Sequence, residues 1–152
     1  MGQDQAERPY FASKLLIIVA PIGVFCINFA TVMIIGADRY VEFSVDKIMH
    51  IVGGASITIT FAGILWYLVC CQVLDLADIN IFRLVVSGLL STAIILWEIL
   101  EYVLMILNVL PDWFDRNTYA DTITDMIFGF IGGVPLILNF KSHYVRRIRR
   151  NL

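Results

Sequence analysis

Hydrophobic residues gather in four long runs, each bounded by polar or charged residues. The runs cover about Lys14–Ala37, Lys47–Cys71, Ile81–Leu107 and Tyr119–Phe140. Each is at or above the roughly 20 residues that an α-helix needs to cross the hydrocarbon core of a bilayer. Because an unpaired backbone amide is costly in hydrocarbon, runs of this length are expected to be helices. The pattern therefore predicts an all-α integral membrane protein with four spans.

Short polar connections separate the predicted helices, at Asp38–Val45, Gln72–Asn80 and Asn108–Thr118. Short connections make neighbouring helices antiparallel. No internal repeat or low-complexity tract divides the chain. We therefore expect residues 1–152 to form a single transmembrane domain, an antiparallel four-helix bundle that ends in a basic tail at residues 141–152.

The composition agrees with a membrane protein. The chain is 59% hydrophobic and 16% charged, and its mean hydropathy is +0.81. Such a chain has too little polar surface to cover a water-soluble globule. The first run is longer than a signal-peptide core and has no convincing small-residue cleavage site after it, so we expect it to be retained as a helix. The three cysteines lack metal-ligand spacing.

Basic residues are unequally distributed over the predicted connections. The first and third connections and the helix ends beside them carry Arg39, Lys47 and Arg116, whereas the other eight of the 11 basic residues lie near the termini or in the middle connection. Cytoplasmic segments carry an excess of Lys and Arg. We therefore expect both termini in the cytoplasm and the first and third connections outside. The basic tail directly follows a span, which favours anionic lipid headgroups as its partner and excludes nucleic acid.

Each of the last three predicted helices carries a pair of ionisable residues that face the same side. The pairs are Asp46 and His50, Glu98 and Glu101, and Asp121 and Asp125. Counted inward from the outer end of each span at ~1.5 Å per residue, all six lie within about 13 Å of that end. Glycines below His50 and Asp125 let the helix backbones approach closely. The six residues are therefore expected to converge.

Single members of this set have simpler interpretations. Asp46 and Asp121 lie at helix N-termini, where a carboxylate can cap free amides. His50 alone could be a polar packing residue. Glu98 and Glu101 lie inside a span, where capping does not explain an acid. The signal is therefore the combination of six residues rather than any one of them.

Five carboxylates near the bilayer interior need neutralisation, either by protons or by a bound cation. Since Lys47 is the one organic counter-charge nearby in the sequence, we favour a divalent metal ion. Carboxylates with one imidazole suit Mg²⁺, Mn²⁺, Zn²⁺ or Fe²⁺. The predicted metal ligands are Asp46, His50, Glu98, Glu101, Asp121 and Asp125.

The motifs resemble those of a known family. Asp46-Lys-x-x-His50, Glu98-x-x-Glu101 and Asp121-Thr-x-x-Asp125 followed by glycines resemble the VanZ-like group of small four-helix membrane proteins, and more closely a related set of uncharacterised bacterial and archaeal inner-membrane proteins. The similarity covers about residues 46–133. Glu101 stands where VanZ-like proteins usually have Gln, and Gly129 where they usually have Asn. The resemblance implies a multi-pass protein of the inner membrane with an envelope role, and names no reaction.

The first functional hypothesis is a metal-dependent hydrolase or transferase that acts on a lipid or lipid-linked headgroup at the outer leaflet. The ion would activate water and stabilise charge on a phosphoryl or acyl oxygen. Glu98 would be the catalytic base if it is not a ligand, and Lys47 or Tyr102 would contact the headgroup. The chain has no phosphate-binding loop, nucleophile elbow or Cys-x-x-Cys motif, which excludes the easily recognised enzymes.

Two alternatives remain open. In the first, the cluster binds a cation or proton during transport, although only Ser87, Ser91, Thr58 and Thr60 continue a polar path toward the cytoplasm. A homo-oligomer could complete such a path. In the second, the chain is a non-catalytic envelope partner whose cluster orders the bundle or binds a lipid.

Overall fold

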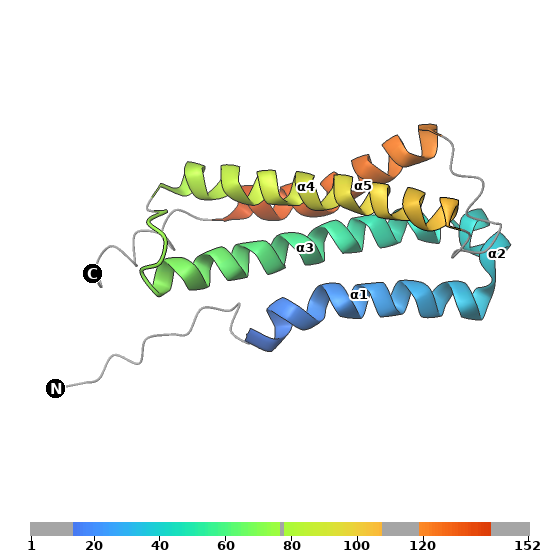
Figure 1. Cartoon of the computed structure of the whole chain (residues 1–152), viewed down its shortest axis with the longest axis horizontal. Helices are drawn as coiled ribbons and strands as arrows, with labels where there is room; N and C mark the ends of the chain where they lie inside the picture. The colour runs from blue at the N-terminus through green and yellow to red at the C-terminus, as the bar shows by residue number, and fades with distance from the viewer. Residues whose placement is uncertain (1–13, 77, 108–118, 141–152) are drawn as a thin grey trace.

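The computed structural model describes residues 14–76, 78–107 and 119–140. These residues form four long helices, α1 (Lys14–Ile35), α3 (Val45–Cys70), α4 (Ile79–Ile106) and α5 (Tyr119–Asn139), and one short helix, α2 (Ala37–Glu42). The long helices run back and forth along the same direction (Figure 1). The predicted all-α, antiparallel four-helix bundle is confirmed. The third connection, Asn108–Thr118, and the basic tail at residues 141–152 lie outside the described residues.

Three helices are long and apolar enough to cross a membrane, over Val45–Val69, Ile79–Ile106 and Tyr119–Asn139. Many large apolar side chains of these helices are exposed, as expected for surfaces that face lipid. The first helix has 22 residues, and its apolar segment among the residues searched is Val19–Ile35. A membrane protein is therefore supported by three spans, and the fourth span stays a prediction.

The first connection differs from the prediction. The apolar run was expected to continue as helix to Ala37, but α1 ends at Ile35 because Gly36 adopts a left-handed backbone conformation with φ 80°. That conformation favours glycine and commonly ends helices. The chain then forms α2 within the predicted connection. This short helix lies beside the start of α3 (Figure 1).

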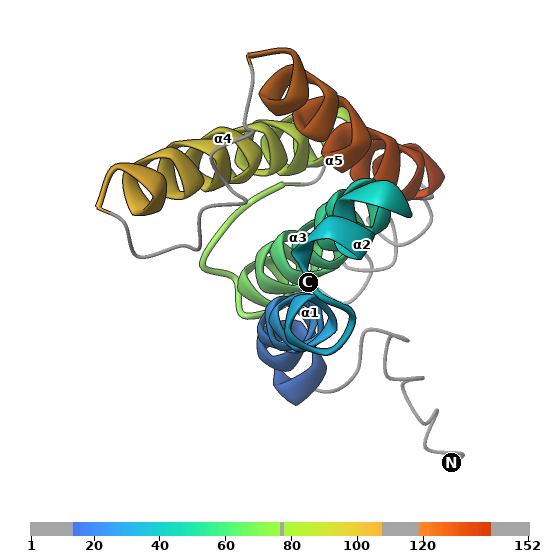
Figure 2. The ribbon, with the colours of Figure 1, turned by 90° about the vertical axis from the view of Figure 1, so that its right-hand side faces the viewer.

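Helix α3 is the centre of the bundle, because it packs against α1, α4 and α5. Helix α1 packs on the side of α3 away from α4 and α5 (Figure 2). The apolar core lies between α3, α4 and α5, with Val86 and Leu90 fully buried. The other buried members of this core are Ala62, Leu65, Phe82, Ile94 and Ile137.

Glycines bring α3 and α5 into backbone contact. A Cβ atom added to Gly54 would overlap the carbonyl oxygen of Gly129, and one added to Gly132 would overlap the carbonyl oxygen of Ile51. Gly54 lies one helical turn after His50, and Gly129 one turn after Asp125. The close contact therefore sets the distance between the two ionisable residues of the adjoining turn.

Candidate metal centre

The predicted ligands meet at one end of the bundle. In Figure 1 this is the right-hand end, where α3 and α5 begin and α4 ends. Antiparallel packing places the first turns of α3 and α5 beside the last turns of α4. Because α4 runs in the opposite direction, acids near its C-terminal end reach the same level as those near the N-terminal ends of its neighbours.

Lys47 joins α3 to α5 through three carboxylates. Its Nζ lies 2.6 Å from Asp121 Oδ1, 2.6 Å from Asp125 Oδ1 and 3.2 Å from Asp46 Oδ2. An ammonium has three donors, so these contacts can satisfy all of them. Such charge-assisted hydrogen bonds are among the stronger kinds in proteins. Lys47 therefore neutralises part of the cluster, and its predicted contact with a lipid headgroup stays a prediction.

His50 lies at the meeting point of two groups of potential ligands. The first group is Asp46, His50 and Asp125, and the second is His50, Glu98 and Glu101. Within each group, one ligand atom from each residue lies within 4.8 Å of the other two. In the first group His50 Nε2 is 3.5 Å from Asp46 Oδ1 and 3.7 Å from Asp125 Oδ2. The structure thus brings five of the six predicted ligands together around one imidazole.

The two glutamates of α4 are both buried, but their surroundings differ. Trp97 Nε1 donates a hydrogen bond of 2.8 Å to Glu101 Oε1. Glu98 is 8% exposed, and its buried Oε1 has no hydrogen-bond partner among the described residues. A buried acid without a partner is costly. Glu98 therefore has an oxygen available for a proton, a cation or a donor group of a ligand.

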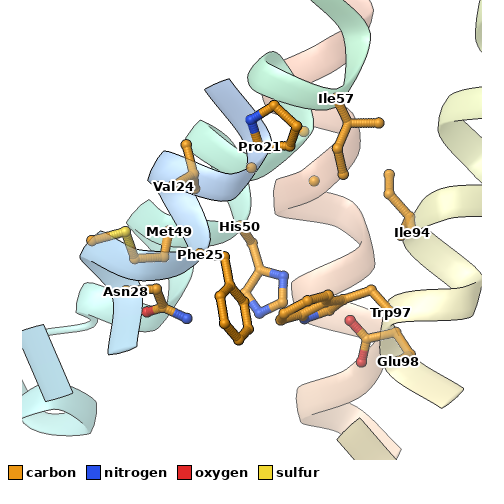
Figure 3. Close-up of a pocket in the computed structure, with 13 residues that line it drawn as sticks. Pro21, Val24, Phe25, Asn28, Met49, His50, Ile57, Ile94, Trp97 and Glu98 are labelled. Atoms are coloured by element: carbon orange, nitrogen blue, oxygen red, sulfur yellow. The ribbon is translucent and has the colours of Figure 1, made fainter. Parts of the chain in front are cut away.

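A pocket of about 240 Å³ adjoins this centre, between α1, α3 and α4 (Figure 3). His50 and Glu98 line it together with Asn28 of α1. Its other walls are mainly apolar. The rings of Phe25 and Trp97 make an edge-to-face contact across the pocket, with centroids 6.0 Å apart. The ionisable cluster is therefore continuous with an apolar space rather than sealed inside the bundle.

Tyr40 of α2 holds the polar side chain that α1 contributes to this pocket. Its side chain is buried, and its hydroxyl donates a hydrogen bond to Asn28 Oδ1. Burial raises the pKa of Tyr40 far above its ordinary value, and the nearby carboxylates of Asp46 and Glu101 act in the same direction. The hydroxyl therefore stays protonated and remains a donor throughout the physiological pH range.

Replacing Tyr40 with phenylalanine is expected to lower the free energy of unfolding by about 1 kcal/mol, because Asn28 Oδ1 loses its donor. Tyr102→Phe is the matched control, since Tyr102 is 58% exposed; its effect should stay within about 0.5 kcal/mol. Unfolding in mixed detergent micelles measures both. Equal losses in the two variants would contradict the assigned role of Tyr40.

The remaining predicted site residues lie at the edge of the centre. Asp121 contacts Lys47 and belongs to neither ligand group, and its side chain is 39% exposed. Tyr102 is exposed although Glu101 is buried, because successive helix positions point about 100° apart. Trp97 and Tyr40 were missed by the sequence analysis. The four-residue spacing of Trp97 and Glu101 was a usable signal, whereas nothing local connects Tyr40 with Asn28.

No family model matches the chain, and neither a curated protein nor a solved structure matches it. The resemblance to the VanZ-like group accordingly stays a prediction from the three motifs.

Proposed function

We propose that this chain is a membrane-embedded protein that binds a divalent metal ion and uses it to hydrolyse or transfer a lipid or lipid-linked headgroup at the outer leaflet. The observation that carries the proposal is the position of His50, which both ligand groups share. One of these groups includes the buried, unpartnered Oε1 of Glu98. This oxygen supports a ligand-binding role beyond that of an acidic cluster alone.

The distribution of charge supports a cation on the α4 side of the centre. The ion pairs of Lys47 all go to aspartates of α3 and α5. Within the described part of the chain, no Lys or Arg pairs with Glu98 or Glu101. Ionised carboxylates are expensive at membrane depth. A divalent ion between His50, Glu98 and Glu101 would offset the charge that Lys47 does not reach.

The donor set favours borderline or hard ions. One imidazole with several carboxylates suits Mn²⁺, Zn²⁺ or Fe²⁺, and the carboxylates alone suit Mg²⁺. A bound ion would supply an activated water and stabilise negative charge on the substrate. Glu98 would accept the proton of that water if it remains outside the coordination shell. The distribution of basic residues supports placement at the outer leaflet, and the family resemblance supports the inner membrane.

Metal binding tests the proposal directly. Chelator-washed protein in detergent is expected to bind Mn²⁺ stoichiometrically, measured by equilibrium dialysis with elemental analysis. Glu98→Gln and His50→Ala should each weaken Mn²⁺ binding by at least about tenfold, because each removes a metal ligand or a group that orients one. Without metal, Glu98→Gln should be at least as stable as the native chain, because it removes a buried charge.

Glu42→Gln is the matched control, because Glu42 is an exposed acid of α2 at the same end of the bundle. It should leave Mn²⁺ affinity unchanged. Zn²⁺ and Mg²⁺ are measured in the same way. The metal proposal fails if none of these ions binds stoichiometrically, or if binding survives equally in Glu98→Gln and His50→Ala.

Transport is the second candidate, and polar side chains below the centre favour it. Ser56 and Thr58 are buried on α3, and their hydroxyls have no hydrogen-bond partner in the part of the chain that the structure describes. The fully buried Val86 and Leu90, however, fill the interior between α3, α4 and α5. We therefore rank transport below catalysis. Flux of Mn²⁺ or protons into proteoliposomes would favour transport over catalysis. Metal binding with neither flux nor turnover would favour a non-catalytic envelope partner.

A further inference from the structure

The polar residues of the pocket between α1, α3 and α4 gather at one end of it. Its polar residues, Asn28, His50 and Glu98, lie on one side in Figure 3. Pro21, Ile57 and Ile94 lie on the other side, whereas Phe25, Met49 and Trp97 lie on the same side as the polar residues. The pocket therefore has a polar end at the candidate metal centre and an apolar end away from it.

This separation follows the expected direction of the membrane normal. Ile57 comes seven residues after His50 on α3, which corresponds to about 10 Å along the helix axis. Pro21 comes seven residues before Asn28 on the antiparallel α1, so it lies at a similar depth. Ile94 comes one turn before Glu98 on α4. All three helices thus place the polar residues of the pocket near the membrane surface, and Pro21, Ile57 and Ile94 lie deeper.

Two groups at the polar end are available to a ligand. Glu98 Oε1 is buried, has no hydrogen-bond partner among the described side chains and backbone, and belongs to a residue that lines the pocket. The hydroxyl of Tyr40 donates a hydrogen bond to the carbonyl oxygen of the Asn28 side chain. The amide nitrogen of that side chain lies on the pocket side (Figure 3). An acceptor and a donor therefore lie at the same end.

The volume limits what can enter. A cavity of about 150 Å³ lined by apolar side chains is large enough for benzene, whereas pockets for drug-sized molecules begin at about 300 Å³. At about 240 Å³, this pocket has room for a segment of one hydrocarbon chain and not for a whole two-chain lipid. It is partly open, so the rest of the molecule can remain in the bilayer.

We infer that this pocket binds one hydrocarbon chain of a lipid, with the first polar group of that lipid at Asn28, His50 and Glu98. The inference rests on the proposed function and specifies its substrate as a lipid that enters sideways from the bilayer. The hydrocarbon chain of the lipid lies along Ile57 and Ile94, and its polar group lies at the candidate metal centre. A water-soluble headgroup without its chain is then a poor substrate.

Photolabelling tests this inference. The full chain is placed in phosphatidylcholine nanodiscs that contain phosphatidic acid with a diazirine on one acyl chain, and labelled peptides are identified by mass spectrometry. Labelling is expected at Val24, Ile57 and Ile94 and should be saturable. Labelling at Leu84, which is 72% exposed, should instead rise in proportion to lipid. Unlabelled phosphatidic acid and polyprenyl phosphate serve as separate competitors, and displacement by either supports a hydrocarbon-chain site.

A matched pair of glycine variants gives the sharpest control. A Cβ added to Gly53 or to Gly88 would meet no atom within 4 Å, but only Gly53 lines the pocket. Gly53→Leu should reduce saturable labelling by about tenfold, because its side chain takes the space of the apolar chain. Gly88→Leu should leave labelling unchanged. If Gly53→Leu fails to fold, Val24→Phe fills the same pocket from α1.

The two proposals fail separately. Gly53→Leu should retain Mn²⁺ binding, so lost labelling with intact Mn²⁺ binding supports the pocket assignment. Saturable labelling without Mn²⁺ binding would support the hydrocarbon-chain site and overturn the proposed metal-dependent function. Uniform labelling, or equal labelling of Gly53→Leu and Gly88→Leu, would overturn the hydrocarbon-chain site. A dimer that Gly53→Leu disrupts, with no saturable labelling, would assign the pocket to a second copy of the chain and also overturn it.

Discussion

Replacing Lys47 with methionine is expected to lower the free energy of unfolding by about 3 kcal/mol, the lower end of the range for breaking a buried ion pair. The loss arises because three aspartates share this ammonium. Asp125 contributes most, since its side chain is 3% exposed, whereas the Asp121 side chain is 39% exposed and partly solvated. Methionine retains the apolar stem, so the change isolates the charge.

Unfolding in detergent mixed with increasing dodecyl sulfate measures this loss. Arg39→Met is the matched control, because Arg39 is an exposed cation of α2 at the same end of the bundle; its effect should stay within about 0.5 kcal/mol. Mn²⁺ should partly restore the stability of Lys47→Met if the centre binds cations. A loss no greater than that of Arg39→Met would show that the ion pairs of Lys47 contribute little.

The helices and the level of the site could be predicted because both depend on local regularities. The length of each apolar run predicts a span, and the helical rise predicts the depth of each acid within it. These two rules predict that Glu98 of α4 and His50 of α3 both lie within about 13 Å of the outer end of their spans, although the helices run in opposite directions. The structure brings the two residues together. The glycines that permit the close approach of α3 and α5 were also recognisable from their spacing.

The partners within the site could not be predicted from local patterns, because they depend on how each helix is rotated. Lys47 contacts aspartates of α5 that are more than 70 residues away in the sequence. Tyr40 reaches Asn28 only because Gly36 reverses the chain after α1. The pocket depends on α1 packing mainly against α3, which hydropathy does not specify.

These contacts divide the cluster into two parts with different electrostatic properties. On the side of α5, Lys47 offsets the charge of the aspartates. On the side of α4, Glu98 and Glu101 lie close to His50, and Glu98 also lines the pocket. A cation is therefore most strongly favoured where the pocket meets the centre, which is also where the polar group of a bound lipid would lie.

Replacing Gly54 with alanine is expected to lower the free energy of unfolding by about 3 kcal/mol, the upper end of the usual range for overpacking. The new Cβ would overlap the backbone carbonyl of Gly129, and no side-chain rotation can relieve that overlap. Helices α3 and α5 must therefore separate. Because this contact lies one turn below His50, separation should also move His50 relative to Glu98 and Glu101 and weaken Mn²⁺ binding to that group.

Gly53→Ala is the adjacent control on the same helix, since its Cβ would meet no atom within 4 Å. Both substitutions increase helix propensity by the same amount, about 1 kcal/mol in favour of alanine. The difference between the two variants therefore reports the contact with α5 alone. It is measured as unfolding free energy and as Mn²⁺ affinity in one buffer. Equal stability and equal affinity of the two variants would show that α5 does not approach α3 through Gly54 and Gly129, and the arrangement of the centre would then need another explanation.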